Sequence, residues 1–461
     1  MEQILRQFWV LLSTKLVYGS ALVVGTTLSF DTLSALQTIH TKSANLFKGD
    51  EFYGLLDGGP EGGQSLQMTQ DNEEHAARRK VLDRMMPSRE RAFRIINDLA
   101  KQFAAAAWNE ANVNDGLLDI NKAASWFGFD VISTIAFGKP LNMLHSPDFR
   151  WVPKCLQYAS TFLYWAGFAR SLQVMRWFMG SDWPSRLGMG DAVEAQRYQD
   201  LAESQVKQRA DRMADEKALG NGPEDLFGRL IQANLYSDID LRADSSLLIA
   251  AGSDAVRLTI GATLFYWGRH PEAFEKAKQE IRSCVDDPDR VTDGLLSSLK
   301  YLRACLDETM RLTPPVASSV PREVDQGGII VDGIPVPAGM SVGTSTYAMH
   351  RNPAIFPRPD EYVPERWLER PIDPKTIAAF NPFLKGPRAC PGKMIAYLAM
   401  HAGLFHLVYN YDLVVRDEGI EHKRTMSKLG YTGIRGDEYP IHDCILGYAE
   451  GPMVELCPRA L

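Results

Sequence analysis

The spacing of apolar residues is helical from about Glu73 to Leu312, which predicts a large helical body. The preceding segment SALVVGTTLSF, residues 20–30, is rich in β-forming residues and is broken by a glycine, as in a hairpin. The pattern then changes, because 14 of the 26 prolines fall between Pro314 and Pro391. Since proline excludes long helices, we expect short strands and an irregular meander there, followed by one last long helix.

No repeat, linker or low-complexity stretch interrupts this pattern, so we expect a single mainly α domain over residues 1–461. A hydrophobic content of 45% is enough to bury a large core. The net charge of -7 does not favour contact with phosphate backbones, which argues against a nucleic-acid partner. The six cysteines lack paired spacing, which favours a reducing compartment. The N-terminal apolar runs are short and interrupted, so neither a signal peptide nor a membrane anchor is expected.

Two charged residues, Asp254 and Arg257, stand inside the apolar helical run from Leu247 to Trp267. They are three residues apart and therefore lie on one face of the predicted helix. An ion pair within the helix is one explanation, and a chemical role for the carboxylate is the other.

Cys390 precedes the last predicted helix, with Pro391 in the favoured first helical position. The free amides at that helix start face the sulfur, which predicts a stabilised thiolate. In the same segment, PFLKGPRACPG, Phe383 can shield the sulfur and Arg388 is suited to binding a carboxylate.

The five residues Phe383, Gly386, Arg388, Cys390 and Gly392 form the pattern FxxGxRxCxG, by which the chain resembles the cytochrome P450 superfamily. The resemblance implies the cytochrome P450 fold, mainly α with small β-sheets and a proline-rich meander before the cysteine loop. It also implies that Cys390 is the axial ligand of the iron of haem b. Phe383, Arg388 and Gly392 would then contact the cofactor.

Further motifs follow the order found in this family. LDETMRL contains Glu308 and Arg311, and EYVPERW contains Arg366, which stands 24 residues before Cys390. By resemblance these three charged residues form a buried ion network that locks the meander, a structural rather than catalytic role. The cations that the resemblance assigns to the haem propionates are His75, Arg79, Arg322 and Arg388.

The stretch AGSDAV resembles the family's distal-helix motif A/G-G-x-D/E-T, with Asp254 as the acid and Ala255 in place of the usual threonine. In the family the acid and the hydroxyl organise water and deliver protons on the oxygen side of the haem. Thr259 lies one helical turn further on and is a poor substitute. A proton-relay role of Asp254 and an ion pair with Arg257 therefore both remain open.

The resemblance implies a monooxygenase that uses O2 and electrons from an NADPH-dependent reductase, closest to fungal enzymes of secondary metabolism. NADPH would act only through that reductase. Without the distal threonine, the substrate or a water could supply the missing hydrogen bond. The alternatives are non-insertive oxidation, such as phenol coupling or desaturation, reductase-independent rearrangement of a peroxide, and a non-catalytic haem sensor.

The expected substrate is a hydrophobic small molecule, because the predicted pocket is mostly apolar. The pocket is expected to contain Leu248, Ala251, Val316, Ala317 and Ser318, together with the aromatic segment near residue 165. We expect a monomer inside the cell, in the cytoplasm or at the cytosolic face of the endoplasmic reticulum, with peripheral membrane contact. The basic residues expected around the thiolate side, where a reductase docks in this family, are Arg78, Lys80, Lys385 and Lys393.

Overall fold

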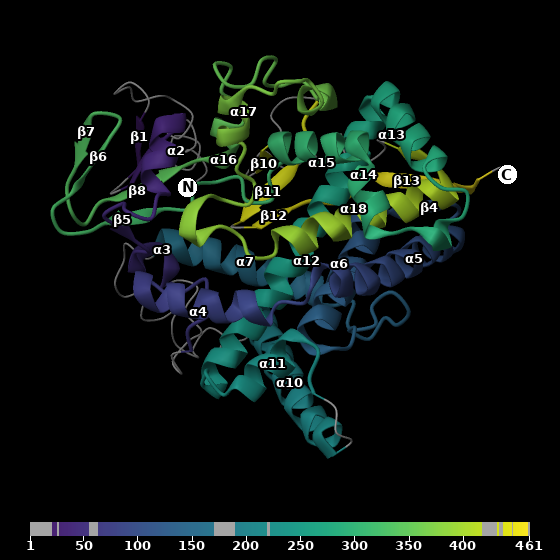
Figure 1. The fold of residues 1–461 in the computed structure, drawn as a ribbon, viewed down its shortest axis with the longest axis horizontal. Coiled ribbons are helices and arrows are strands. Elements are labelled where there is room, and N and C mark those ends of the chain that lie inside the picture. The colour runs from purple at the N-terminus through teal and green to yellow at the C-terminus, as the bar shows by residue number, and fades with distance from the viewer. Residues whose placement is uncertain are drawn as a thin grey trace.

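The computed structural model describes residues 21–24, 27–54, 63–169, 190–218, 222–416, 431–432, 437–444 and 446–459. These residues form a mainly helical body with small sheets, which confirms the predicted fold class (Figure 1). The longer helices are α4 (Asn72–Met85), α5 (Arg89–Val113), α6 (Ile120–Phe137), α7 (Val152–Ala169), α10 (Gly190–Ala218), α12 (Asp238–Arg269), α13 (Pro271–Ser283), α15 (Lys300–Leu312) and α18 (Lys393–Asn410). The shorter ones are α2 (Leu33–Ile39), α3 (Asp50–Tyr53), α11 (Leu226–Ala233), α14 (Asp293–Ser298), α16 (Thr346–Met349), α17 (Pro374–Ala379) and the 3-10 turns η1 (Pro288–Arg290), η2 (Pro364–Trp367) and η3 (Gly386–Arg388).

The strands form small sheets at the edges of the helical body. A five-stranded sheet has the order β1 (Ala21–Val24), β2 (Thr27–Phe30), β8 (Ser341–Thr344), β5 (Arg322–Val324), β3 (Leu46–Phe47). The antiparallel pairing of β1 with β2 confirms the predicted hairpin. The remaining sheets contain β4 (Leu117–Asp119), β13 (Met453–Pro458) and β9 (Tyr411–Arg416); β10 (Tyr431–Thr432), β11 (Ile441–Cys444) and β12 (Leu446–Tyr448); and β6 (Ile329–Val331) with β7 (Ile334–Val336).

The long helices begin where the sequence supplies a capping side chain. Asp71, Ser88, Asp119 and Ser237 each accept a hydrogen bond from an amide in the first turn of α4, α5, α6 and α12, respectively. Between β5 and α18 the elements are no longer than six residues, as the proline density predicted.

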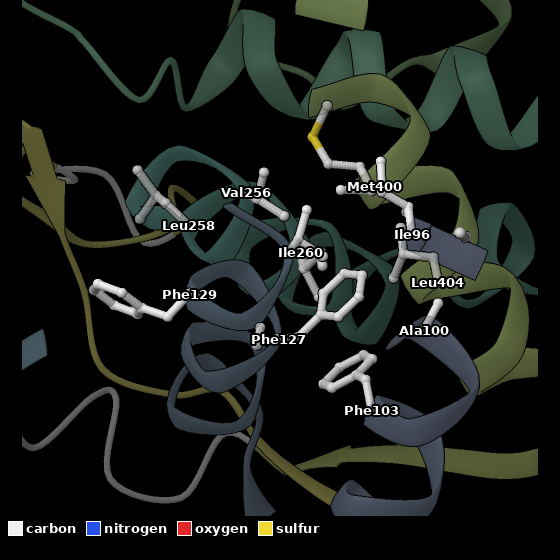
Figure 2. Close-up of a cluster of buried hydrophobic side chains, with 14 of the residues drawn as sticks. Ile96, Ala100, Phe103, Phe127, Phe129, Val256, Leu258, Ile260, Met400 and Leu404 are labelled. Atoms are coloured by element: carbon white, nitrogen blue, oxygen red, sulfur yellow. The ribbon is translucent and has the colours of Figure 1, made fainter. Parts of the chain in front are cut away.

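The core lies where α5, α6, α12 and α18 meet (Figure 2). Apolar side chains from all four helices point into one cluster, with Phe103 stacked on Phe127 at 5.0 Å between ring centroids. α6 and α12 pack closely through two glycines. A Cβ on Gly128 would lie 2.8 Å from the carbonyl oxygen of Ser253, and one on Gly252 would overlap Ile132. Small residues at this crossing fix the position of α12.

Among the helices that the structure describes, α12 alone has the length and apolar composition to cross a membrane. However, 67% of its most apolar window is buried inside the protein. Burial in the core accounts for this composition without a membrane.

Candidate haem-thiolate site

Cys390 lies in the loop between η3 and α18, and the local sequence explains the shape of this loop. Gly386 has a φ of +72°, and a Cβ there would overlap the carbonyl oxygen of His40, so glycine is required. The amide of Cys390 donates to the carbonyl of Phe383 at 2.8 Å and closes the loop. The amide of Gly392, the N-cap of α18, donates toward the Cys390 sulfur.

The Cys390 side chain is open to solvent, although protein atoms surround the sulfur on most sides. Burial raises the pKa of this thiol, while the amides of Gly392 and Lys393 and the charge of Arg79 lower it. The amides at the helix start act in the expected direction, and burial outweighs them in the protein without a metal ion. A metal ion would reverse this balance, because it binds the deprotonated sulfur.

Glu308 on α15 is fully buried and is the centre of a paired network. Arg311 donates two hydrogen bonds to its carboxylate at 2.8 and 2.9 Å, and Arg366 of η2 donates one at 3.0 Å. Trp367 Nε1 and the amide of Val363 complete the set at 3.0 and 2.9 Å. Burial alone would raise the pKa of Glu308, but the two guanidinium groups hold it below its usual value.

The structure thus brings together the three residues predicted for the meander network. Arg311 also donates to the carbonyl groups of His350, Pro359 and Glu361, so a single side chain binds three points of the meander. The sequence reasoning missed Trp367, which stands in the quoted EYVPERW motif and donates directly to the carboxylate.

A cluster of cations lies beside the Cys390 loop. The buried His75 of α4 has its pKa lowered to about 3, by burial first and then by the charges of Arg388, Lys48, Arg79 and Arg322. Burial and Arg322 also lower the pKa of Arg388, to about 10. The four residues predicted for the propionates therefore share one site, where burial and the charges of the three arginines disfavour the protonated form of His75. Two carboxylates beside a metal-bound cysteine would balance this charge, so the residues present fit a haem.

Hydrogen bonds hold each guanidinium group of this cluster in place. Arg79 donates to the carbonyl of Ala389, next to the cysteine, at 2.6 Å and pairs with Asp83 at 2.8 Å. Arg322 donates to the Tyr53 hydroxyl at 2.5 Å. These contacts aim the cations toward the cysteine loop before a cofactor binds.

Lys48 belongs to the same cluster and was not found from the sequence. Its side chain is almost completely buried, contacts the Tyr53 ring and donates to the carbonyl of Gln67 at 2.5 Å. Burial, Arg388 and Arg322 lower its pKa to about 6. The pairing of β3 with β5 places Lys48 beside Arg322, and no local sequence motif predicts that pairing.

The segment 63–71 connects this cluster to α12. Arg388 donates to the carbonyl groups of Thr69 and Gln70 at 2.7 and 3.0 Å. At the other end the amide of Leu66 donates to Asp244 of α12 at 2.7 Å. Arg78 donates to the same Asp244 at 3.3 Å. Arg78 is therefore buried in an ion network, and the expectation that it lies on a basic docking surface was wrong.

The other three residues of that expected surface differ in exposure. Lys80 and Lys393 are exposed, whereas Lys385 is half-buried and donates to the carbonyl of Ile377 at 3.2 Å. Burial lowers the pKa of Lys385. Two of the four expected basic residues thus face solvent.

On the distal helix α12, Asp254 pairs with Arg257 at 3.1 Å, and both side chains are buried. Arg257 also donates to Asn121 and to the carbonyl of Ala449, each at 3.3 Å. Asp254 is therefore held by the ion pair that was one of its two explanations. The hydroxyl of Thr259 donates to the carbonyl of Ala255 at 2.8 Å, which uses its proton within the helix.

The predicted pocket residues differ in accessibility. Ala251 and Ser318 are exposed, Leu248 and Val316 are half-buried, and Ala317 is part of the core. Ala255 is half-buried and lies one turn from Ala251 on the same face of α12. Among the described residues, this face and residues 316–318 are accessible except at Ala317. The side chains near residue 165 lie outside the described residues.

Comparisons with known proteins identify relatives of this chain. The profile of the family "Cytochrome P450" matches residues 19–433. Cytochrome P450 monooxygenase fscF of Fusarium equiseti is 30% identical over 465 residues, which cover 94% of this chain and 83% of that protein. Cytochrome P450 monooxygenase apf8 of Gibberella fujikuroi is 29% identical over 382 residues, covering 79% and 98%. Cytochrome P450 monooxygenase atnE of Emericella nidulans is 26% identical over 468 residues, covering 94% and 83%.

The family profile spans the region from the first strand through the cysteine loop to β10, and so includes every site residue named above. The relatives match over most of their own length as well as over most of this chain. The chain belongs to the cytochrome P450 family.

Proposed function

We propose that this protein is a haem-thiolate monooxygenase of fungal secondary metabolism that oxidises a hydrophobic small molecule with O2 and electrons from an NADPH-dependent reductase. The observation that carries the proposal is the meeting of Cys390 with a cluster of basic side chains, in which Arg79 donates to the carbonyl of Ala389 and Arg388 and Arg322 lower the pKa of Lys48. The two propionates of a b-type haem would supply the negative charge that balances these basic residues. Family membership and the similar monooxygenases support the same cofactor and activity.

Each part of the site has a role in this proposal. Cys390 ligates the iron, and Phe383 and Gly392 contact the cofactor beside it. The residues that would bind the propionates are His75, Arg79, Lys48, Arg322 and Arg388. Guanidinium groups suit carboxylates because they can donate two parallel hydrogen bonds. The haem, when bound, supplies the activation of O2.

The distal helix holds the substrate and directs protons. Ala251 and Ala255 lie on one accessible face of α12, where a small side chain leaves room for a hydrophobic substrate. Asp254 lies beside this face and, together with Arg257, Gln157 and His442, lines a small pocket. We place the protonable groups of the reaction at this pocket, with the substrate or a water in place of the absent threonine hydroxyl.

The electron donor binds the thiolate side through exposed basic residues, including Lys80 and Lys393. The protein acts as a monomer inside the cell, in the cytoplasm or at the cytosolic face of the endoplasmic reticulum, with peripheral membrane contact. Five cysteines are free among the described residues, which fits a reducing compartment. Fractionation of the cells and sedimentation of the purified protein test these statements.

The decisive experiment is the difference spectrum of the reduced protein with carbon monoxide, for wild type and Cys390→Ser. We expect the thiolate-type Soret band in wild type and its loss in the variant. Absence of this band in wild type would overturn the proposal. Product formation without O2 or NADPH would identify a peroxide rearrangement instead, and a normal band without any turnover would identify a haem sensor.

A further inference from the structure

Lys48 is a buried amine that lies among basic side chains. Its Nζ atom donates to the carbonyl of Gln67 at 2.5 Å and lies 4.7 Å from the centroid of the Tyr53 ring. Arg322, on the strand paired with β3, donates to the hydroxyl of the same tyrosine at 2.5 Å. A neutral amine can make both contacts of Lys48, because it can donate to a carbonyl group and pack on a ring.

The groups that act on Lys48 come from several elements. Burial is the largest cause that lowers its pKa, and the charges of Arg388 in the cysteine loop and Arg322 on β5 bring it to about 6. On α4, burial and then Arg388 lower the pKa of His75, and Lys48 adds to this. Burial raises the pKa of Tyr53, so its hydroxyl stays protonated.

Two carboxylates adjoin this cluster without facing Lys48. Glu323 follows Arg322 on β5, and its carboxylate lies against Gly49. Because side chains alternate along a strand, Glu323 is on the opposite face from Arg322. Asp71 caps α4, where it accepts amides of the first turn. The charge that acts on Lys48 is therefore positive.

We propose that Lys48 is neutral in the protein without haem and takes up one proton from solvent when the two propionates bind. The inference rests on the proposed function, which brings the propionates to Arg322 and Arg388. Carboxylates of this kind are ionised near neutral pH, and a negative charge close to an amine favours its protonated form. Haem loading is thereby coupled to pH through a residue that does not touch the iron.

The coupling has a defined sign. A ligand that binds the protonated form loses about tenfold in affinity per pH unit for each proton taken up. Below about pH 6 the protein without haem already carries the proton on Lys48, so uptake falls to zero there. Above this pH, the affinity should decrease as the pH rises.

The test uses metal-free protoporphyrin IX, which keeps both propionates but cannot be ligated by Cys390. Fluorescence titration gives its affinity, and calorimetry in buffers of different ionisation enthalpy counts the protons. Near pH 8 we expect wild type to take up about one proton more than Lys48→Met. The dimethyl ester of the same porphyrin brings no charge and should abolish this difference. Equal uptake by the two proteins, or the same difference with the ester, would overturn the inference.

Three further variants assign the proton. Lys48→Arg is always charged, so it should bind the porphyrin without this uptake and more tightly than Lys48→Met; it gives a reading if Lys48→Met does not fold. Lys42→Met is the matched control, because Lys42 is exposed in the segment before β3 and should leave the uptake unchanged. His75→Gln should also retain it. Loss of the uptake in His75→Gln but not in Lys48→Met would overturn the inference.

The outcomes separate this inference from the proposed function. A normal thiolate-type band together with equal proton uptake in wild type and Lys48→Met would contradict the inference alone. A wild-type protein that lacks the band yet takes up the proton with protoporphyrin would contradict the proposed function and support the role of Lys48.

Discussion

Two groups of buried charges flank the Cys390 loop, and they differ in how their charge is balanced. Around Glu308 the carboxylate and two guanidinium groups neutralise one another through short hydrogen bonds within the chain. Around His75 the nearby arginines and Lys48 lower the pKa of His75, and Arg388 and Arg322 lower that of Lys48. The charges of the first group are balanced by residues of the chain itself, whereas the second group is suited to a ligand that brings two negative charges.

This difference predicts opposite results when one charge is removed. A substitution in the balanced group leaves a buried charge without its partner. A substitution in the cationic group relieves repulsion in the protein without haem but weakens the hold on the cofactor. Four experiments test this contrast.

The largest effect is expected for Glu308→Ala. Loss of the carboxylate leaves Arg311 and Arg366 buried and unpaired, which costs about 3 to 5 kcal/mol of unfolding free energy. We expect little haem-loaded protein, measured as the ratio of Soret to protein absorbance. Glu361→Ala is the control, since its exposed pair with Arg358 contributes about 1 kcal/mol or less. Normal haem occupancy in Glu308→Ala would contradict the assignment.

Lys48→Met should separate the two groups most clearly. Without haem, the variant should be more stable than wild type near neutral pH, because folding no longer buries an amine whose protonated form is disfavoured by burial and by Arg388 and Arg322. With haem, dissociation should be faster by roughly 10-fold, the scale of losing a group that supports a metal site. Urea unfolding of the apoprotein and transfer of haem to apomyoglobin measure the two effects. If the Lys48→Met apoprotein were less stable than wild type, the contrast between the Glu308 network and the basic cluster would be contradicted.

The pH dependence of apoprotein stability follows from the same residue. The folded-state pKa of Lys48 is about 6, below its ordinary value of 10.5. Between these values the unfolded chain binds the extra proton, so this residue makes the apoprotein more stable as the pH rises. The wild-type slope should therefore exceed that of Lys48→Met over this range. Equal slopes in the two proteins would show that burial, Arg388 and Arg322 do not lower the pKa of Lys48 in the folded apoprotein.

The smallest effect is expected for His75→Gln. The pKa of His75 is about 3, so the side chain is neutral near pH 7 and its replacement removes no charge. The change in unfolding free energy of the apoprotein should be about 1 kcal/mol or less. Urea titrations near neutral pH measure it, and an effect larger than that of Lys48→Met would show that charge does not dominate this cluster.

The fold class and the centre of the site were predictable because they are encoded locally. Helical spacing and proline density gave the architecture, and short motifs located Cys390 and the Glu308 network. Lys48 could not be found in this way, because its contacts depend on the pairing of two strands that are distant in sequence. Arg78 was misplaced because a run of basic residues does not reveal which one faces inward.

The two glycines at the crossing of α6 and α12 also bear on substrate range. Because Gly128 and Gly252 bring the backbones together, α12 cannot shift toward α6 to accommodate a bulkier molecule. Segment 63–71 contacts α12 through hydrogen bonds to Asp240 and Asp244, and Arg78 of α4 donates to the same segment. Adaptation to new substrates during evolution should therefore leave the helix crossing unchanged and alter other parts of the substrate pocket.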